Sequence, residues 1–289
     1  VLNVILALMM FGVSLGLRRA DFVRIVRSPK APAIGLLAQC ILLPLLTFLL
    51  TLILRPQPSI ALGMMLVAAC PGGNFSNIMT FIARGSVAVS VSMTAVVSLL
   101  AVITTPTLFA FYARLNPNTA DLVTEIQLEP LQMMALVLVV IAVPILLGMY
   151  CGGRFPKLQA KSEKTMRIVS LIIFFAFVVI AFSNNWDLFL SHYDKLVGLV
   201  LLHNSLALGL GYGLATLFGQ PPADRRAITL EVGIQNSGLG LTLLFTFMPQ
   251  LGGAILITAF WGIWHLVSGL ALASYWGRRP LPEVTVVNA

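Results

Sequence analysis

The sequence predicts an all-α polytopic membrane protein with nine transmembrane helices and inverted repeats. Of its 289 residues, 58% are hydrophobic and only 10% are charged, and the mean hydropathy is +0.97. Apolar runs of about 20 residues, the length that crosses a bilayer as a helix, recur along the whole chain. The strands of a β-barrel would instead alternate polar and apolar residues, and these runs do not.

Charged segments and segments rich in Pro or Gly separate the apolar runs. The longest links, at 18–32, 113–130 and 152–167, are too short for a soluble domain, so we expect residues 1–289 to form a single transmembrane unit. The chain begins at Val1 inside an apolar run without a cleavable signal peptide, which leaves open a tenth span before it. The expected spans are 1–17, 33–54, 59–83, 86–112, 131–151, 168–186, 196–218, 227–248 and 252–276.

The basic residues set the expected orientation. The net charge is +8, and the excess of Lys and Arg lies in alternate loops, which are therefore cytoplasmic. This places the N-terminus outside and the C-terminus inside a cell membrane, the inner membrane in a bacterium. Because the charge is a topology signal, we expect no nucleic-acid partner. The cytoplasmic set is Arg18, Arg19, Arg24, Arg27, Lys30, Arg84, Arg154, Lys157, Lys161, Lys164, Arg167, Arg225, Arg226, Arg278 and Arg279, against Arg55, Arg114 and Lys195 outside.

Spans 1–4 recur as spans 6–9 at an offset of 164 residues. A displacement by five spans reverses the direction across the membrane, so the repeats are inverted. Inverted repeats with interrupted helices are typical of secondary transporters. Repeat one covers 1–112 without a first span, and repeat two covers 131–276. The matched pairs are Gln39 with His203, Pro58 with Pro222, and Pro71 with Gln235.

Polar breaks interrupt the third and eighth spans. The first reads "PGGNFSN" from Pro71, where proline removes a backbone donor and two glycines loosen the chain. The second reads "QNSGLGL" from Gln235. Unwound backbone is tolerated at membrane depth only where protein or a water-filled cavity satisfies it. Two breaks at matched positions therefore predict a binding site rather than a packing kink.

Glu231 is the only acidic residue expected deep in a span. A hard monovalent cation needs about five or six oxygen ligands, and one carboxylate among them suits it. Glu231 could instead be a protonated structural acid or a proton carrier. The other acids are expected in loops or at span ends: Asp21, Asp121, Glu125, Glu129, Glu163, Asp187, Asp194, Asp224 and Glu283.

The fourth span carries a hydroxyl every four residues, at Ser86, Ser90, Thr94 and Ser98, so they share one helix face. Ser90 and Thr94 flank the expected midplane and are cation-ligand candidates. Ser86 and Ser98 are equally explained as helix contacts.

Several other polar or small residues have two readings. His265, and the pair His203 and Asn204, either pack between helices or line a site. The spacings Gly12/Gly16 and Gly148/Gly152 predict close helix packing. We expect the three cysteines, Cys40, Cys70 and Cys151, to be packing residues, because their spacing fits neither a disulfide framework nor a metal site.

Three stretches, "CPGGNFSNIMTFIARGSVAVSVSMT", "ITLEVGIQNSGLG" and "WHLVSG", resemble the bile acid:sodium symporter family. The resemblance covers nearly the whole chain. It implies two crossing broken helices, two bound sodium ions, no organic cofactor, an organic-anion substrate and a monomer in the bilayer. It also implies a panel domain in parts of 1–54 and 131–186, and a core domain in 33–112 and 196–276.

Asn74 and Phe75 stand where many bacterial relatives have Thr-Ala, and Leu266 where some have Asn, so a small organic anion is as plausible as a bile acid.

The resemblance also implies three sets of site residues. Sodium site one is Ser76, Asn77, Ser90, Thr94 and Glu231. Sodium site two is Gln39, Glu231, Gln235 and the carbonyls of Val232 and Ile234. The substrate set is Asn74, Asn236 and His265.

The expected function is sodium-coupled symport of an organic anion, such as a bile acid, a steroid conjugate or a small carboxylate, by alternating access. The alternative is a proton-coupled or arsenite-exporter-like carrier of the same broad fold, with Cys70 as the candidate thiol. An enzyme is disfavoured because no paired catalytic acids, HExxH or GxSxG occur in any span. Two symmetric breaks favour a carrier over a channel.

Overall fold

The regular secondary structure elements of the described residues are all helices. The computed structural model describes residues 2–127, 129–155 and 178–279, and isolated positions at 165, 168, 169, 172, 175, 176 and 281. The all-helical fold class is confirmed over these residues. Within the expected sixth span, 168–186, positions 170, 171, 173, 174 and 177 lie outside them, as do Lys157, Lys161, Glu163, Lys164, Arg167 and Glu283.

Within those ranges, five helical segments are long and apolar enough to cross a membrane, and the remaining apolar helices are shorter. The long segments are α3–η1–α4 (Lys30–Leu37, Ala38–Leu42, Leu43–Leu54), α7 (Val87–Leu115), α9–η2–α10 (Pro130–Val137, Leu138–Ala142, Val143–Arg154), α12 (Trp186–Leu217) and α15 (Gly252–Gly277). The shorter helices are α1 (Leu2–Ser14), α2 (Arg19–Arg27), α5 (Pro58–Ala69), α6 (Phe75–Ile82), α8 (Ala120–Glu125), α13 (Pro222–Gly233) and α14 (Ser237–Phe247).

The two interrupted spans are split helices, as predicted. α5 and α13 are each 12 residues long and each begins with a proline, Pro58 and Pro222. They keep the offset of 164 at both ends, since Ala69 and Gly233 are their last residues. Proline suits the first helical position because the N–H it lacks would have no partner there. The helices after the breaks, α6 and α14, begin at Phe75 and Ser237, which are 162 residues apart.

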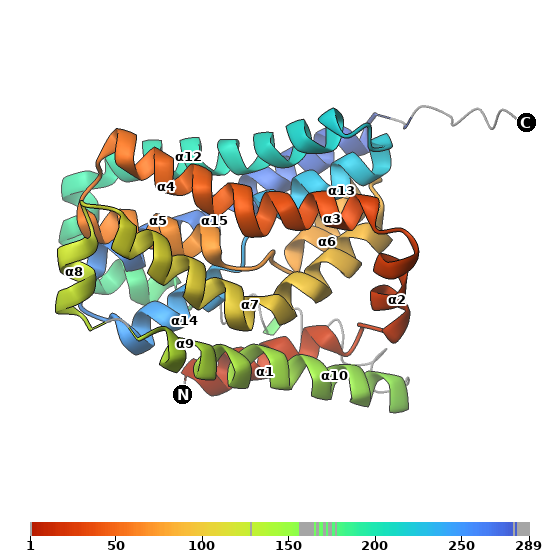
Figure 1. Ribbon diagram of the computed structural model, residues 1–289, viewed down its shortest axis with the longest axis horizontal. Helices are drawn as coiled ribbons and strands as arrows, with labels where there is room; N and C mark the ends of the chain where they lie inside the picture. Colours follow the sequence, from red (N-terminus) through yellow and green to blue (C-terminus); the bar gives the residue numbers. More distant parts are fainter. Residues whose placement is uncertain are drawn as a thin grey trace, which may run out of the picture.

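The helices surround the two breaks. α1 packs against α10, and α12 packs along α13. In Figure 1, α1, α9 and α10 lie along the lower edge, α3, α4 and α12 lie along the upper edge, and the link between α5 and α6 lies between them. The core around the breaks is aliphatic, with Leu62, Leu66, Leu241 and Leu244 fully buried.

Two wide turns interrupt the long helices, and the sequence did not predict them. η1 and η2 are π-helical, and each is followed within two residues by a proline, Pro44 and Pro144. A proline cannot donate to the preceding turn and its ring crowds the carbonyl there, which a wider turn relieves. η1 carries Gln39.

The helix that carries the expected seventh span, 196–218, begins before residue 196. α12 begins at Trp186, so Asp187, Asp194 and Lys195 are exposed on a helix rather than placed in a loop. Its 32 residues extend over about 48 Å, which exceeds the hydrocarbon core of a bilayer. Asp187 lies in the first turn, where a carboxylate favours the helix start.

Other acids expected in links also lie on helices. Asp21 lies on α2 and accepts a hydrogen bond from the Arg18 N–H at 2.8 Å. Asp121 and Glu125 lie on α8. A short polar run carries too weak a periodic signal to predict these helices.

The predicted packing role of Gly148 and Gly152 is confirmed. A Cβ at residue 148 would collide with the side chain of Ser14, and one at residue 152 would collide with the Leu15 carbonyl. The two glycines therefore let α10 approach the backbone of α1 closely.

Candidate functional site

The two helix breaks meet each other. The Gly73 N–H donates to the Ile234 carbonyl at 2.7 Å, and the Asn236 N–H donates to the Pro71 carbonyl at 2.8 Å. The two segments run antiparallel. Each break thus supplies hydrogen-bond partners to the other, which satisfies backbone that has left its helix inside an apolar protein.

Glu231, in the last turn of α13, lies at this crossing and is 0% exposed. Three hydroxyls donate to its carboxylate: Ser76 to Oε2 at 2.5 Å, Thr94 to Oε1 at 2.7 Å, and Ser90 to Oε2 at 3.2 Å. Ser76 comes from α6, while Ser90 and Thr94 are one turn apart on α7. Three helices therefore converge on one carboxylate.

Asn77 completes this group. Its Oδ1 accepts hydrogen bonds from Ser90 Oγ at 2.8 Å and from Thr94 Oγ1 at 3.3 Å. The five residues predicted to form the first sodium site thus lie together. They present two carboxylate oxygens, one amide oxygen and three hydroxyl oxygens, the kinds of ligand that a hard cation prefers.

Among the described residues, the hydrogen-bond partners of the Glu231 carboxylate are uncharged. A buried carboxylate is costly unless a positive charge compensates it. Within the described ranges, the hydrogen-bond partners of Glu231 are hydroxyls, and no Lys, Arg or His side chain is among them. A bound proton or a bound cation would each compensate it.

The residues of the second predicted site also lie together. Gln39 Nε2 donates to Gln235 Oε1 at 2.7 Å and to the Cys70 carbonyl at 3.0 Å. Gln235 Nε2 donates to the Val232 carbonyl at 2.7 Å. Gln39 therefore joins both breaks through its amide, while the Ile234 carbonyl already accepts a backbone hydrogen bond.

The predicted substrate residues are more dispersed. Asn236 caps α14, because its side chain accepts from the Leu239 N–H at 3.0 Å, and its Nδ2 is 4.0 Å from Met10 Sδ of α1. His265 is 3% exposed, with Nδ1 3.5 Å from Ser237 Oγ. Asn74 directly precedes α6 and is half-buried. Their role toward a substrate stays a prediction.

Of the pair His203 and Asn204, only Asn204 reaches a break. Asn204 Nδ2 donates to the Gly233 carbonyl at 2.8 Å, and its Oδ1 accepts from Ser268 Oγ at 2.6 Å. His203 contacts Thr47 at 2.7 Å and the Trp261 ring instead. The repeat offset matches Gln39 with His203, whereas the neighbouring Asn204 makes the contact with the break.

Thr105 and Ser268 are support residues that the sequence did not single out. Thr105 Oγ1 donates to the Ala69 carbonyl at the end of α5, at 2.7 Å. A hydroxyl that supports a helix end looks in sequence like any other membrane-helix hydroxyl. Both residues are far from the breaks in sequence, so no sequence signal marks them.

The sequence is similar to those of several known proteins. The sequence pattern of the Sodium Bile acid symporter family matches residues 3–192. The chain is 34% identical over 278 residues to the Uncharacterized sodium-dependent transporter YocS of Bacillus subtilis, covering 96% of this chain and 83% of that protein. It is 32% identical over 279 residues to a Probable sodium/metabolite cotransporter of Arabidopsis thaliana chloroplasts, covering 96% and 67%. It is also 32% identical over 235 residues to the mouse Sodium/bile acid cotransporter 4, covering 80% and 52%.

Proposed function

Since the chain belongs to the sodium bile acid symporter family, we propose that it drives uptake of an organic anion with sodium ions, by alternating access. Its relatives are transporters rather than enzymes, and the chain is accordingly a sodium-coupled membrane transporter. Beyond this class, we propose an organic-anion cargo, two sodium ions and alternating access.

The observation that carries the proposal is the buried carboxylate of Glu231 among hydroxyls and an amide oxygen. One sodium ion is assigned to Ser76, Asn77, Ser90, Thr94 and Glu231. Its charge would balance the carboxylate, and each hydroxyl keeps lone pairs for the ion while it donates to Glu231 or Asn77.

A second sodium ion is assigned to Gln39, Glu231, Gln235 and the carbonyls of Val232 and Ile234. This set spans both breaks, so an ion there would link the α5–α6 pair to the α13–α14 pair. Two ions moving inward supply about 2.3 kcal/mol each per 100 mV of membrane potential.

The cargo is assigned to the ends of the split helices. α6 and α14 begin directly after Asn74 and Asn236, and helix N-termini favour a carboxylate or sulfate. Asn236 also lies next to Met10 of α1. A cargo held by Asn74, Asn236 and His265 would therefore contact the core-like and the panel-like parts together.

The proposal also includes how the helices divide into panel and core and how the protein is oriented in the membrane. The panel consists of α1 and α9–η2–α10, with the part of the chain at 168–186, and the core consists of the remaining long and split helices. Arg55 and Arg114 lie near one end of the bundle, and Arg84 and Arg278 near the other. The end with Arg84 faces the cytoplasm, the N-terminus is outside, and the protein acts as a monomer.

The test is a thermal-shift screen of bile acids, steroid sulfates and small carboxylates, each in sodium and in potassium. We expect at least one anion that stabilises the protein in sodium alone, because binding to the folded state raises its stability. The same anion should then enter vesicles down a sodium gradient. Equal stabilisation in potassium, with uptake that follows a proton gradient, would overturn the proposal.

A further inference from the structure

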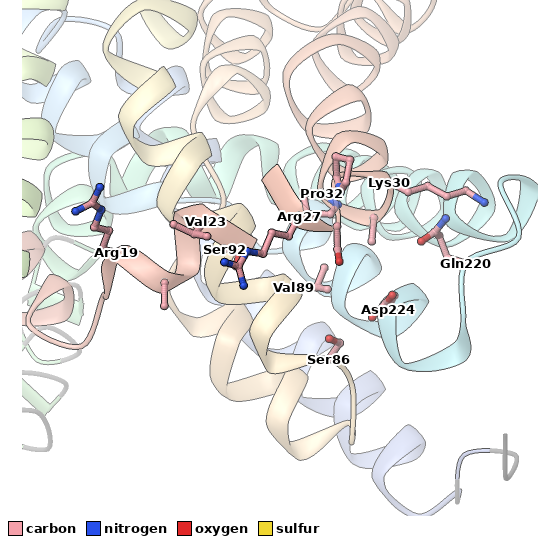
Figure 2. A pocket seen from close by; sticks show the side chains of 14 residues that line it. Arg19, Val23, Arg27, Lys30, Pro32, Ser86, Val89, Ser92, Gln220 and Asp224 are labelled. Atoms are coloured by element: carbon pink, nitrogen blue, oxygen red, sulfur yellow. The ribbon is translucent and has the colours of Figure 1, made fainter. Parts of the chain in front are cut away.

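A cavity of about 900 Å³ lies at the end of the bundle where α2, α3, α7 and α13 meet. Figure 2 shows side chains from these four helices around it. The cavity shares no residue with the Glu231 group. None of the residues assigned to the two sodium ions lines it.

The walls of this cavity are basic. Arg19 and Arg27 lie two turns apart on α2 with Val23 between them, so the three share one face of that helix. Lys30 adds a third cation from the start of α3. Asp224 is the one carboxylate among the lining residues. The cavity thus carries a positive excess and favours an anion.

Three helices begin at this cavity. α3 begins at Lys30, α7 at Val87 and α13 at Pro222, and Lys30, Ser86 and Asp224 from these starts line the wall. No side chain caps any of the three starts. A hydrogen bond from the Ser86 N–H to the Ala223 carbonyl, at 2.9 Å, holds two of the starts together. Helix N-termini are positive and attract phosphate groups.

A buried hydroxyl without a partner lies on the cavity wall. Ser92 lines it and is 0% exposed, and its Oγ has no hydrogen-bond partner among the described residues. Ser92 lies on α7 between Ser90 and Thr94, which reach Glu231, so the helical repeat turns it to another face. An unpaired buried hydroxyl costs free energy, and a bound oxyanion would supply its acceptor.

We propose that this cavity binds the phosphate group of an anionic phospholipid from the adjacent leaflet. The exposed apolar side of α2 favours a lipid over a soluble phosphate. Val26 is 82% exposed there, and a helix with basic and apolar sides suits the membrane interface. Arg19, Arg27, Lys30 and the three helix starts would hold the headgroup, and Ser92 would donate to a phosphate oxygen.

The test measures the thermal stability of the full-length protein in detergent, without sodium or cargo, so its outcome is independent of the proposed transport function. Phosphatidylglycerol, phosphatidylcholine and inorganic phosphate are titrated separately. We expect stabilisation by phosphatidylglycerol alone. The double variant Arg19→Gln/Arg27→Gln should weaken that effect by about fivefold for each arginine.

Two further variants separate the site from general effects. Ser92→Ala should leave the Tm without lipid unchanged or raised, yet weaken the response to phosphatidylglycerol, because it removes only a donor to the ligand. Arg278→Gln removes an exposed cation at the same end of the bundle but outside the cavity, and should respond as the unmodified protein does.

Three results would overturn the proposal. Equal stabilisation by phosphatidylcholine would show a general lipid effect. A loss with Arg278→Gln as large as with the double variant would show diffuse surface charge. Equal stabilisation by inorganic phosphate would assign the cavity to a soluble anion instead of a lipid.

Discussion

The Glu231 carboxylate packs directly on the Cα of Gly72. A Cβ built at residue 72 would overlap Glu231 Oε1 and lie 2.9 Å from the carboxyl carbon. The two glycines of the first break therefore differ in their surroundings, because a Cβ at Gly73 would instead approach the Gln235 carbonyl at 3.0 Å. Residue 72 must be a glycine for the Glu231 carboxylate to lie against its Cα, and this contact positions the carboxylate.

Gly72→Ala should therefore displace Glu231 from its hydroxyl partners. We expect sodium affinity to fall by about 10-fold, the free-energy equivalent of mild overpacking. The measurement is a sodium titration of the Tm at constant ionic strength. Gly209→Ala is the matched control, since a Cβ at residue 209 of α12 meets nothing within 4 Å. Unchanged sodium affinity in Gly72→Ala would contradict the described packing.

Thr94→Val keeps the shape of the side chain and removes the hydroxyl that donates to Glu231 Oε1. In the proposed site this hydroxyl oxygen is also a ligand of the ion, so we expect sodium to bind at least about 10-fold more weakly, or about 1.4 kcal/mol. Thr104→Val, on the same helix, removes a hydroxyl whose partner among the described residues is the Leu100 carbonyl, and should leave sodium binding as it was. Equal behaviour of the two variants would remove Thr94 from the site.

Gln39 and Gln235 should be energetically coupled because their amides bond to each other across the two breaks. In a double-mutant cycle of Gln39→Ala and Gln235→Ala, the measured quantity is the sodium-dependent stabilisation. We expect a coupling energy of about 1–2 kcal/mol. A cycle of Gln39→Ala with the exposed Gln132→Ala should be additive. Additivity in both cycles would mean that the amide pair does not link the breaks.

Cys70→Ala tests the arsenite-exporter-like alternative. Cys70 is buried, and its carbonyl rather than its thiol contacts Gln39. Alanine keeps that carbonyl, so we expect uptake of an organic anion to be fully retained, with a stability loss of about 1 kcal/mol from the lost sulfur. Loss of uptake together with normal folding would support a thiol mechanism.

The parts of the fold that follow from chain composition could be predicted. Pro58 and Pro222 marked two helix starts correctly, since proline fits the first turn, and Pro71 with its two glycines marked a break. Glu231 was found because a carboxylate in an apolar run has few structural uses.

The parts that depend on packing could not be predicted. The proline after the turn at Gln39 could equally have ended the helix, and the charged residues in the first turns of α12 gave no apolar signal for its start at Trp186. Asn204 reaches the Gly233 carbonyl only through the way α12 lies on α13, and no spacing in the sequence encodes that contact.

The central claim is that Glu231 binds the coupling ion, and sodium-dependent stabilisation of Glu231→Gln tests it most directly. The Tm is measured in sodium and in potassium for the unmodified chain, for Glu231→Gln and for Glu125→Gln, which removes an exposed carboxylate. The account predicts a sodium-specific rise in Tm for the unmodified chain and for Glu125→Gln. It predicts at least about 100-fold weaker sodium binding in Glu231→Gln, because a buried ion loses its charged partner. Retention of the full sodium response in Glu231→Gln would contradict the claim.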